Sequence, residues 1–475
     1  MDHQMWDELL QYMSEDRHGG SPEMLAKVLT RVALAGGPVP RSAISKGSML
    51  IRPSVLASGT VGKATNALVE EGLLAEEDST NSGRPGPPIT PLRFGDQWAI
   101  IGLHIDQQHD GPDGVAGIIC GLDRKPLTDL ERSEVPRKGD QHDERRLAAE
   151  IRKLTEKLLT QLDGPRKFLG VGIEIGGHVY RGVVEDSVHA GWSEKVDLHQ
   201  ILAQELGDVP GLERVPGVAE NDVNALTIHR YYERSFEGLD VALVTVFRQG
   251  VGGGLILDGR MYRGVHGMAP EMGHLPAEYS EDSLTREAPP SRDAAEGRNF
   301  DDECLCSTQY RKKYRHVDAL AVPARIEGQL TTLKQGEKIS LEKAAAAPQA
   351  VPRGDTLVLS DEAVVLRRAG RALGRGLAAM INIVNPGQIV LRLPEALATP
   401  IPQSSGAEYL AAVESEVDGA YSTGPDDARN GQRSLTVQAY ADDQVAHDGA
   451  VAAATTVFNA FVEHARGRDG CPSLR

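Results

Sequence analysis

Residues 240–257, DVALVTVFRQGVGGGLIL, join two apolar strand-like runs through a glycine-rich turn. Gly250, Gly252 and Gly253 follow the first run, where glycines permit a tight turn and a close approach of the backbone to a phosphate. The same pattern is also typical of a plain β-hairpin, because the second strand-like run follows at once. Both interpretations stay open at this point.

Short apolar runs alternate with long amphipathic segments on both sides of this stretch. The strand-like runs cover residues 99–105, 115–122, 168–175 and 388–393, and helical spacing recurs in residues 147–162, 365–380 and 445–465. Such alternation favours an α/β fold. Because residues 97–475 are too many for a single lobe, we expect two lobes with a cleft, and polar loops at 278–303 and 399–435.

The composition narrows the class of protein. The chain has 475 residues, of which 40% are hydrophobic and 25% charged, as in an ordinary globular protein. No apolar run approaches the roughly 18 residues of a membrane span, and the acidic N-terminus lacks the apolar core of a signal peptide. Four cysteines are too few for a disulfide framework. We therefore expect a cytoplasmic protein with no membrane partner.

The charge is distributed unevenly along the chain. The formal net charge is −17, yet residues 22–66 contain six basic residues and a single acidic one, Glu23. A basic segment on an acidic body suits a DNA-binding protein, since the basic segment contacts phosphates and the acidic body limits nonspecific binding. A solvated basic face would have the same composition.

Residues 21–82 predict a winged helix-turn-helix, between an N-terminal tail (1–20) and a linker (83–96). Helical spacing in residues 24–35 is followed by a short second helix and by SGTVGKATNALVEEGLL (58–74). This last stretch ends a helix at a glycine and continues into a polar hairpin. A recognition helix followed by a wing has this order, although an ordinary three-helix bundle would look similar.

The expected DNA contacts lie on the exposed side of the third helix and beside it. Small polar and basic side chains there can reach base edges and phosphates in the major groove. They are Thr60, Lys63, Thr65 and Asn66. Arg41 opens the second helix, and Arg84 lies between Gly83 and Pro85, with little bulk to prevent its insertion into a minor groove. An ordinary linker arginine is the alternative for Arg84.

Three further groups of polar residues suit a ligand. Asn221 and Asp222 follow an apolar run and could hold sugar hydroxyls, with the carboxylate as acceptor or general base, although a helix N-cap has the same pattern. Glu271 and His274 place a carboxylate and an imidazole near a glycine. Two closely spaced cysteines downstream could join His274 as zinc ligands, with no fourth ligand in view. They are Cys304 and Cys306.

Taken together and in order, these motifs resemble the ROK family of repressors, open reading frames and kinases. They are GRP at 83–85, AENDVNAL at 219–226, GVGGGLILDGRMYRG at 250–264, APEMGHL at 269–275 and NPGQIVL ending at residue 391. The resemblance covers roughly residues 22–465 and implies a two-lobed, actin-like ATPase fold for residues 97–475. Family members with an N-terminal winged helix are sugar-responsive transcription factors, whereas members without one are usually sugar kinases.

One departure from the family pattern affects the predicted binding of ATP. The kinases carry an acidic-Ile-Gly-Gly-Thr-like phosphate loop on the first strand, but here His104 takes the aspartate position and Asp106 and Gln107 replace the two glycines. We therefore expect no ATP and no kinase activity. The alternatives that stay open are an ATP-dependent sugar kinase with Asp222 as base, and a regulator that has lost its effector and answers to a protein partner.

A second departure affects the zinc and sugar segment, whose family pattern is Cys-x-Cys-Gly-x-x-Gly-Cys-x-Glu. Arg311 replaces the third cysteine and Lys313 the glutamate, so zinc would have three protein ligands at most, and its presence stays open. The resemblance implies a sugar site made of Gly177, Asn221, Asp222, Glu271 and His274. We predict a repressor that binds a double-stranded DNA operator as a homodimer or tetramer and responds to a sugar.

Overall fold

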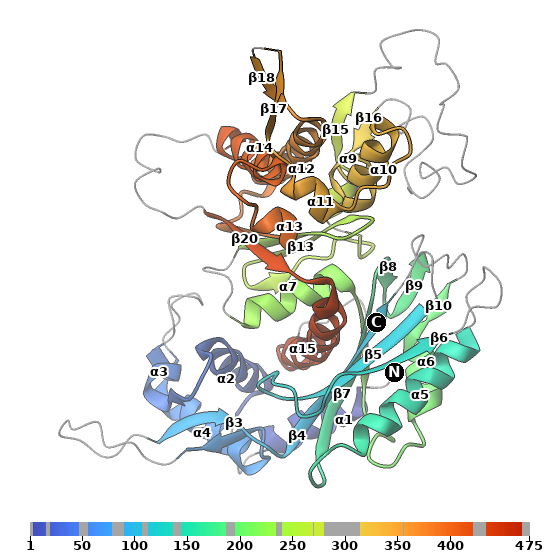
Figure 1. Cartoon of the computed structure of the whole chain (residues 1–475). Coiled ribbons are helices and arrows are strands. Elements are labelled where there is room, and N and C mark those ends of the chain that lie inside the picture. The colour runs from blue at the N-terminus through green and yellow to red at the C-terminus, as the bar shows by residue number, and fades with distance from the viewer. Residues whose placement is uncertain are drawn as a thin grey trace. The chain divides into compact units, whose positions relative to one another are not determined.

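The computed structural model of the chain divides into two compact units (Figure 1). Unit 1 contains residues 1–239, 265–267 and 443–475, and unit 2 contains residues 240–264 and 268–442. The residues that the structure describes are 3–15, 20–46, 56–77, 90–106, 113–135, 144–186, 195–233, 240–268, 270–279, 314–354, 356–420 and 434–467. Within these ranges, no helix is long and apolar enough to cross a membrane.

Unit 1 is built on a five-stranded sheet in the order β11-β7-β4-β5-β6. These strands are β4 (Trp98–Asp106), β5 (Asp113–Gly121), β6 (Glu131–Val135), β7 (Lys167–Ile175) and β11 (Gly217–Asn221). The strands β11, β7 and β4 are parallel, whereas β5 and β6 run antiparallel to their neighbours. A small antiparallel sheet joins β8 (His178–Tyr180), β9 (Val183–Asp186) and β10 (Val196–Asp197).

Helices cover both faces of the unit 1 sheet (Figure 1). The helices α5 (Glu144–Leu159) and α6 (Leu198–Leu206) lie on one face, and α7 (Asp222–Tyr232) and α15 (Val445–Ala465) on the other. Helix α15 packs very closely on the strands, since a Cβ atom at Gly102 would lie 1.9 Å from the carbonyl oxygen of Ala450. The predicted C-terminal helix is confirmed, and glycines in the strands make room for its backbone.

The predicted winged helix-turn-helix also belongs to unit 1. It contains α2 (Pro22–Ala35), α3 (Arg41–Lys46) and α4 (Ser58–Glu70), with a sheet in the order β1-β3-β2. Its strands are β1 (Val39–Pro40), β2 (Leu74–Glu76) and β3 (Pro91–Phe94). Strand β3 lies in the predicted linker, so the linker boundary was wrong: the second strand of the wing extends to Phe94, where it pairs with Leu74.

The predicted N-terminal tail is a helix, α1 (Gln4–Ser14), which is a correction to the sequence analysis. Trp6 is fully buried, its indole nitrogen donates to the carbonyl oxygen of Leu169 at 2.8 Å, and its ring meets that of Phe461 edge-on. Apolar residues at a spacing of three to four positions form the buried face of α1. Burial of this face packs the helix against β7 and α15, which carry Leu169 and Phe461.

Unit 2 contains a second five-stranded sheet in the order β14-β13-β12-β19-β20. The strands are β12 (Val241–Val246), β13 (Val251–Leu257), β14 (Arg260–Met261), β19 (Gln388–Pro394) and β20 (Ser434–Tyr440). The strands β12, β19 and β20 are parallel. Two antiparallel two-stranded sheets pair β15 (Pro276–Tyr279) with β16 (Tyr314–His316) and β17 (Ala350–Arg353) with β18 (Thr356–Leu359).

The helices of unit 2 pack around α12 (Asp361–Val384). Its main partner is α14 (Ser405–Ala420), which lies where the sequence predicted a polar loop over residues 399–435. A Cβ atom at Gly370 would lie 2.2 Å from the carbonyl oxygen of Tyr409, so glycine allows the two helix backbones to approach. Other described helices of unit 2 are α9 (Asp318–Ala321), α10 (Pro323–Leu333), α11 (Leu341–Ala346), α13 (Glu395–Ala398) and the 3-10 turn η2 (Met272–His274).

Candidate DNA-binding surface and ligand site

The exposed face of α4 is open and carries little bulk. Lys63 and Asn66 are exposed, Thr60 is half-buried, and Cβ atoms added at Gly59 and Gly62 would meet nothing within 4 Å. Positions 59, 62, 63 and 66 lie on one side of the helix because they are three to four residues apart. Small residues there let a helix backbone approach base edges closely, as a recognition helix must.

Arg41 connects this face of α4 to the wing. Its guanidinium donates to the side-chain oxygen of Asn66 and to the carboxylate of Glu76, both at 2.7 Å. The predicted DNA contacts Arg41 and Asn66 therefore lie together. Arg84 lies outside the described residues, and its role stays a prediction.

Thr65 was a wrong prediction. Its side chain is fully buried, and its hydroxyl donates to the carbonyl oxygen of Gly62 at 2.9 Å. Thr65 comes four residues after Val61 and therefore lies on the buried side of the same helix. It supports the packing of α4 and is not available to contact DNA.

In unit 1 the structure brings Gly177, Asn221 and Asp222 together. Asn221 caps α7, since its side-chain oxygen accepts from the amides of Val223 and Asn224 at 3.1 Å. Its amide nitrogen donates to the carbonyl oxygen of Gly177 and to the carboxylate of Asp222, both at 2.9 Å. Gly177 has a φ of +116°, which favours glycine in this turn. The helix-cap interpretation of Asn221 is confirmed, and the cap also orients Asp222.

Asp222 is the first residue of α7, and its carboxylate accepts from the Val223 amide at 2.7 Å. Burial, together with the negative charge of Glu174, raises the pKa of Asp222 to about 7. Perturbed carboxyl groups of this kind are common at functional sites, because such sites combine burial with neighbouring charges. The geometry therefore agrees with a role for Asp222 in binding.

Beside Asp222, the sequence analysis missed a buried ion pair. His104 of β4 and Glu174 of β7 are register partners on parallel strands, and the imidazole Nδ1 is hydrogen-bonded to Glu174 Oε1. The side chains are almost fully buried, and His104 Nε2 and Glu174 Oε2 have no hydrogen-bond partner among the described residues. Burial alone would lower the pKa of His104, but the Glu174 carboxylate outweighs it and raises the pKa. A single acid within the apolar run FLGVGIEI was the available signal.

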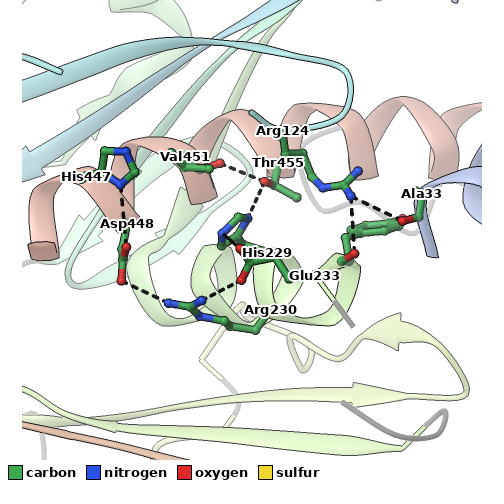
Figure 2. Close-up of polar contacts among 10 residues, drawn as sticks. Ala33, Arg124, His229, Arg230, Glu233, His447, Asp448, Val451 and Thr455 are labelled. Atoms are coloured by element: carbon green, nitrogen blue, oxygen red, sulfur yellow. Dashed lines mark hydrogen bonds and ion pairs between the residues drawn. The ribbon is translucent and has the colours of Figure 1, made fainter. Parts of the chain in front are cut away.

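A polar network connects α7 with α15 and with the winged helix (Figure 2). His229 Nδ1 lies 3.0 Å from the hydroxyl of Thr455, and Arg230 pairs with Asp448 at 3.1 Å. These contacts fix α7, which begins at Asp222, against the C-terminal helix.

Arg124 extends this network to α2 of the winged helix-turn-helix (Figure 2). Its guanidinium is 3.4 Å from the carbonyl oxygens of both Ala33 and Tyr232, and lies over the ring of Tyr232 at 5.6 Å. Ala33 is in the last turn of α2 and Tyr232 ends α7, so one cation contacts the C-terminal ends of both helices. A cation at these ends is favourable, since helix C-termini carry partial negative charge.

In unit 2, Glu271 immediately precedes the turn η2, and His274 is the last residue of that turn. His274 Nδ1 is 4.0 Å from Glu271 Oε2 and its Nε2 is 3.9 Å from Asp318 Oδ2. The sequence analysis missed Asp318, whose pKa burial raises to about 7. Because Gly177, Asn221 and Asp222 belong to unit 1, a sugar site shared by all five predicted residues stays a prediction.

Zinc also stays a prediction, because Cys304 and Cys306 lie outside the described residues. Within the described ranges, no three His, Cys, Asp or Glu side chains converge to hold a metal ion. The carboxylates of Glu271 and Asp318 lie 4.0 Å and 3.9 Å from the ring nitrogens of His274. A zinc site at His274 would need the two cysteines as ligands.

The glycine-rich stretch forms a β-hairpin, as the plainer interpretation predicted. Gly252 and Gly253 lie in β13 opposite Thr245 and Val244, and the Phe247 amide donates to the carbonyl oxygen of Gly250 at 2.8 Å. A Cβ atom at Gly253 would lie 2.4 Å from Met272 Cγ. The absence of a side chain at Gly253 thus makes room for η2.

A cavity of about 390 Å³ lies in unit 2 at the carboxyl ends of β12, β19 and β20. Ligands of α/β proteins commonly bind at this edge of a sheet. Three carboxylates line the cavity, those of Glu342, Glu395 and Asp442, with a single guanidinium, that of Arg248, which is 2.8 Å from Glu327. This charge distribution does not favour the phosphates of a nucleotide.

Comparisons with known proteins agree with this architecture. The DNA-binding transcriptional dual regulator NagC of Escherichia coli is 24% identical over 75% of this chain and 76% of its own length. The xylose repressor of Bacillus subtilis is 24% identical over 54% of this chain and 60% of its own length.

Two solved structures share the fold. A ROK family transcriptional regulator, a homologue of the E. coli MLC protein, matches 94% of this chain and 98% of its own with a TM-score of 0.63 and 18% identity. A ROK hexokinase from Thermus thermophilus matches 76% of this chain and 98% of its own, with a TM-score of 0.52 and 21% identity. The first match extends to the N-terminal domain, and both share the two-lobed, actin-like fold.

The model of the ROK family matches residues 113–393, more than half of the chain. The matched range includes the β7, α7 and η2 elements that carry the candidate ligand residues. With a winged helix-turn-helix preceding an α/β body of this topology, the chain belongs to the ROK family.

Proposed function

We propose that the chain is a DNA-binding repressor whose affinity for a double-stranded operator is controlled by a sugar bound beside Asp222. One observation carries the proposal: the open face of α4 and the Gly177–Asn221–Asp222 group lie in the same compact unit, where α7, α15 and Arg124 link them. The names of two relatives support this proposal, since NagC is a DNA-binding transcriptional dual regulator and the Bacillus subtilis relative is a xylose repressor.

The proposed mechanism is a shift between two states of unit 1. A sugar that hydrogen-bonds to Asp222 changes the position of α7 at its N-terminus, and Arg124 transmits the change from the other end of α7 to α2. Such coupling requires that the sugar bind one state more tightly than the other. A homodimer or tetramer would present two recognition helices to paired half-sites.

The alternative is an ATP-dependent sugar kinase with Asp222 as base. Against it stand His104 and Glu174, which occupy the strand ends where the kinases have their first phosphate loop, and the acidic lining of the cavity in unit 2. A sugar-dependent ATPase assay tests this alternative, and turnover would restore it.

The test of the regulator proposal is fluorescence anisotropy of the protein on DNA from the region upstream of its gene, at physiological salt with competitor DNA. The measurement is repeated with glucose, xylose and N-acetylglucosamine. Specific binding that one sugar weakens would support the proposal. Specific binding that no sugar alters would favour a regulator that answers to a protein partner, and the absence of specific binding would contradict the proposal for that fragment.

A further inference from the structure

The side-chain amide of Asn66, on the exposed face of α4, is oriented by an arginine from the preceding helix. Arg41 Nη1 donates to Asn66 Oδ1 at 2.7 Å, and Arg41 Nη2 donates to Glu76 Oε1 at the same distance. A guanidinium has N–H donors and no acceptor, so the atom of Asn66 that faces it is the carbonyl oxygen. The contact fixes the orientation of the amide, because turning it over would place two donors against each other.

The arginine is in turn held in place by its surroundings. Arg41 is the first residue of α3, whose Ile44 is buried, and the Ile44 carbonyl oxygen accepts from the buried guanidinium of Arg31 on α2. Glu76, at the end of β2, binds the other side of the Arg41 guanidinium. The Arg41 side chain is nevertheless 34% exposed, so a base can reach it. Side chains that are held in this way lose less freedom on binding and discriminate better between ligands.

Together, Arg41 and Asn66 offer hydrogen-bond donors beside α4. The amide nitrogen of Asn66 carries two N–H groups, and a guanidinium has five, of which Asn66 and Glu76 accept two. An N–H group that approached Asn66 Oδ1 would meet the positive charge of Arg41, which opposes it. Glu70 offers acceptors, but it is the last residue of α4 and lies one turn beyond Asn66. The space next to Asn66 therefore favours a partner with acceptors.

The four bases differ in what they present in the major groove. Guanine presents two acceptors, N7 and O6, whereas adenine presents one acceptor and one donor. Cytosine presents a donor, and thymine presents one acceptor beside a methyl group. An asparagine that reads adenine uses both its amide nitrogen and its carbonyl oxygen. Because Arg41 already binds the carbonyl oxygen of Asn66, this mode is opposed, and the two-acceptor edge of guanine is the better match.

We propose that the Arg41–Asn66 pair reads a guanine in each half-site of the operator, and that Arg41 is the residue that directs Asn66 to guanine instead of adenine. The inference rests on the proposed function and specifies one base of the DNA. Glu76 is a positioning residue, which holds Arg41 and does not touch the base. Lys63 keeps its predicted contact with a phosphate.

The test is in vitro selection from a pool of random double-stranded DNA by the full chain at physiological salt, carried out for the wild type and for Asn66→Ala. The base that Asn66 reads is the position whose preference is lost in the variant. We expect the wild type to select guanine there. Another base at that position, or no position that loses its preference, would overturn the inference and leave the regulator proposal standing. If the wild type enriches no sequence, both the inference and specific operator binding fail.

Fluorescence anisotropy on the selected duplex tests the contact itself. Replacement of the guanine by 7-deazaguanine, which lacks the N7 acceptor, should weaken wild-type binding about fivefold or more. Exchange of the G·C pair for A·T should weaken it at least as much. An affinity that 7-deazaguanine leaves unchanged would overturn the two-acceptor contact.

The Arg41→Met variant tests the cause of the preference. It should lower the preference for guanine over adenine about fivefold or more, whereas Arg41→Lys, which keeps the charge, should retain more of it. The control is Arg152→Met on α5, whose guanidinium is 33% exposed and binds Asp208, and it should leave the preference unchanged. A guanine preference that survives Arg41→Met intact would refute the role of Arg41. If Arg41→Met does not fold, the selection with the wild type and Asn66→Ala still decides which base is read.

Discussion

The Asp222→Asn substitution should stabilise the protein at alkaline pH and not at acidic pH. The pKa of Asp222 rises from 3.8 to about 7 on folding. Between these two values the folded state keeps a proton that the unfolded state has released, so the free energy of unfolding falls as pH rises and stays low above pH 7. Asparagine does not titrate, and its side-chain oxygen can still accept from Val223 and Asn221.

The size of the effect follows from the shift. Each pKa unit corresponds to about 1.4 kcal/mol, so the full shift of roughly three units sets an upper limit of about 4 kcal/mol. The side chain is only half-buried, and solvent screening reduces this value. We expect a gain of about 1–2 kcal/mol at pH 8 and almost none at pH 4, which corresponds to a Tm increase of a few degrees for units of this size.

The assay is differential scanning fluorimetry of both proteins from pH 4 to pH 8. The control is Asp163→Asn, an exposed aspartate of unit 1, whose Tm difference from wild type should not change with pH. A Tm difference for Asp222→Asn that is constant across this range, or that is larger at pH 4 than at pH 8, would show that the Asp222 carboxyl does not titrate as the structure indicates.

Four other outcomes are expected. The Asp222→Asn variant should bind the operator but lose its response to sugar, and a retained response in the anisotropy titration would place the ligand elsewhere. Lys63→Ala should weaken operator binding and make the plot of log association constant against log salt concentration less steep by about one unit of slope, whereas Lys153→Ala on α5 should leave this slope unchanged. Arg124→Met should preserve DNA binding but reduce the change in Kd caused by sugar by about 5-fold or more, in contrast to exposed Lys125→Met, and an unaltered response would remove Arg124 from the coupling. Trp6→Ala should destabilise the protein by about 3–5 kcal/mol and Trp6→Phe by less in chemical denaturation, and equal losses would assign the effect to the hydrogen bond with Leu169.

The local elements were predictable where one periodic pattern dominated. The strands β4 and β12 and the helices α2 and α15 have the positions expected from their apolar spacing, because the period of two or 3.6 residues is a local property of the chain. Helix α14 was missed, because its glycines and acidic residues are typical of a loop, and its packing against Gly370 and Gly374 of α12 is a tertiary contact that the local pattern does not show. The apolar spacing of α1 at Trp6, Leu10 and Met13 is present in the sequence, but this segment was interpreted as part of an N-terminal tail.

The candidate site was predictable only in part. Asn221 and Asp222 follow a strand and begin a helix, so their neighbourhood is set by adjacent residues and could be recognised from a motif. Glu174 had no such motif, because its partner His104 lies 70 residues away. The candidate ligand residues also come from both units, with Asp222 in unit 1 and His274 in unit 2. Their motifs are separate in the sequence and do not predict the distance between them.

The sequence by itself therefore determined the family, the α/β alternation, the order of the two domains and the residues that begin α7. Only the tertiary structure decided that Arg41 contacts Asn66 and that His104 pairs with Glu174. The physical reason is that a periodic pattern in the sequence defines only which residues share a face of one helix or strand. Strand register and helix packing decide which residues that face contacts, and both depend on residues that are distant in the sequence.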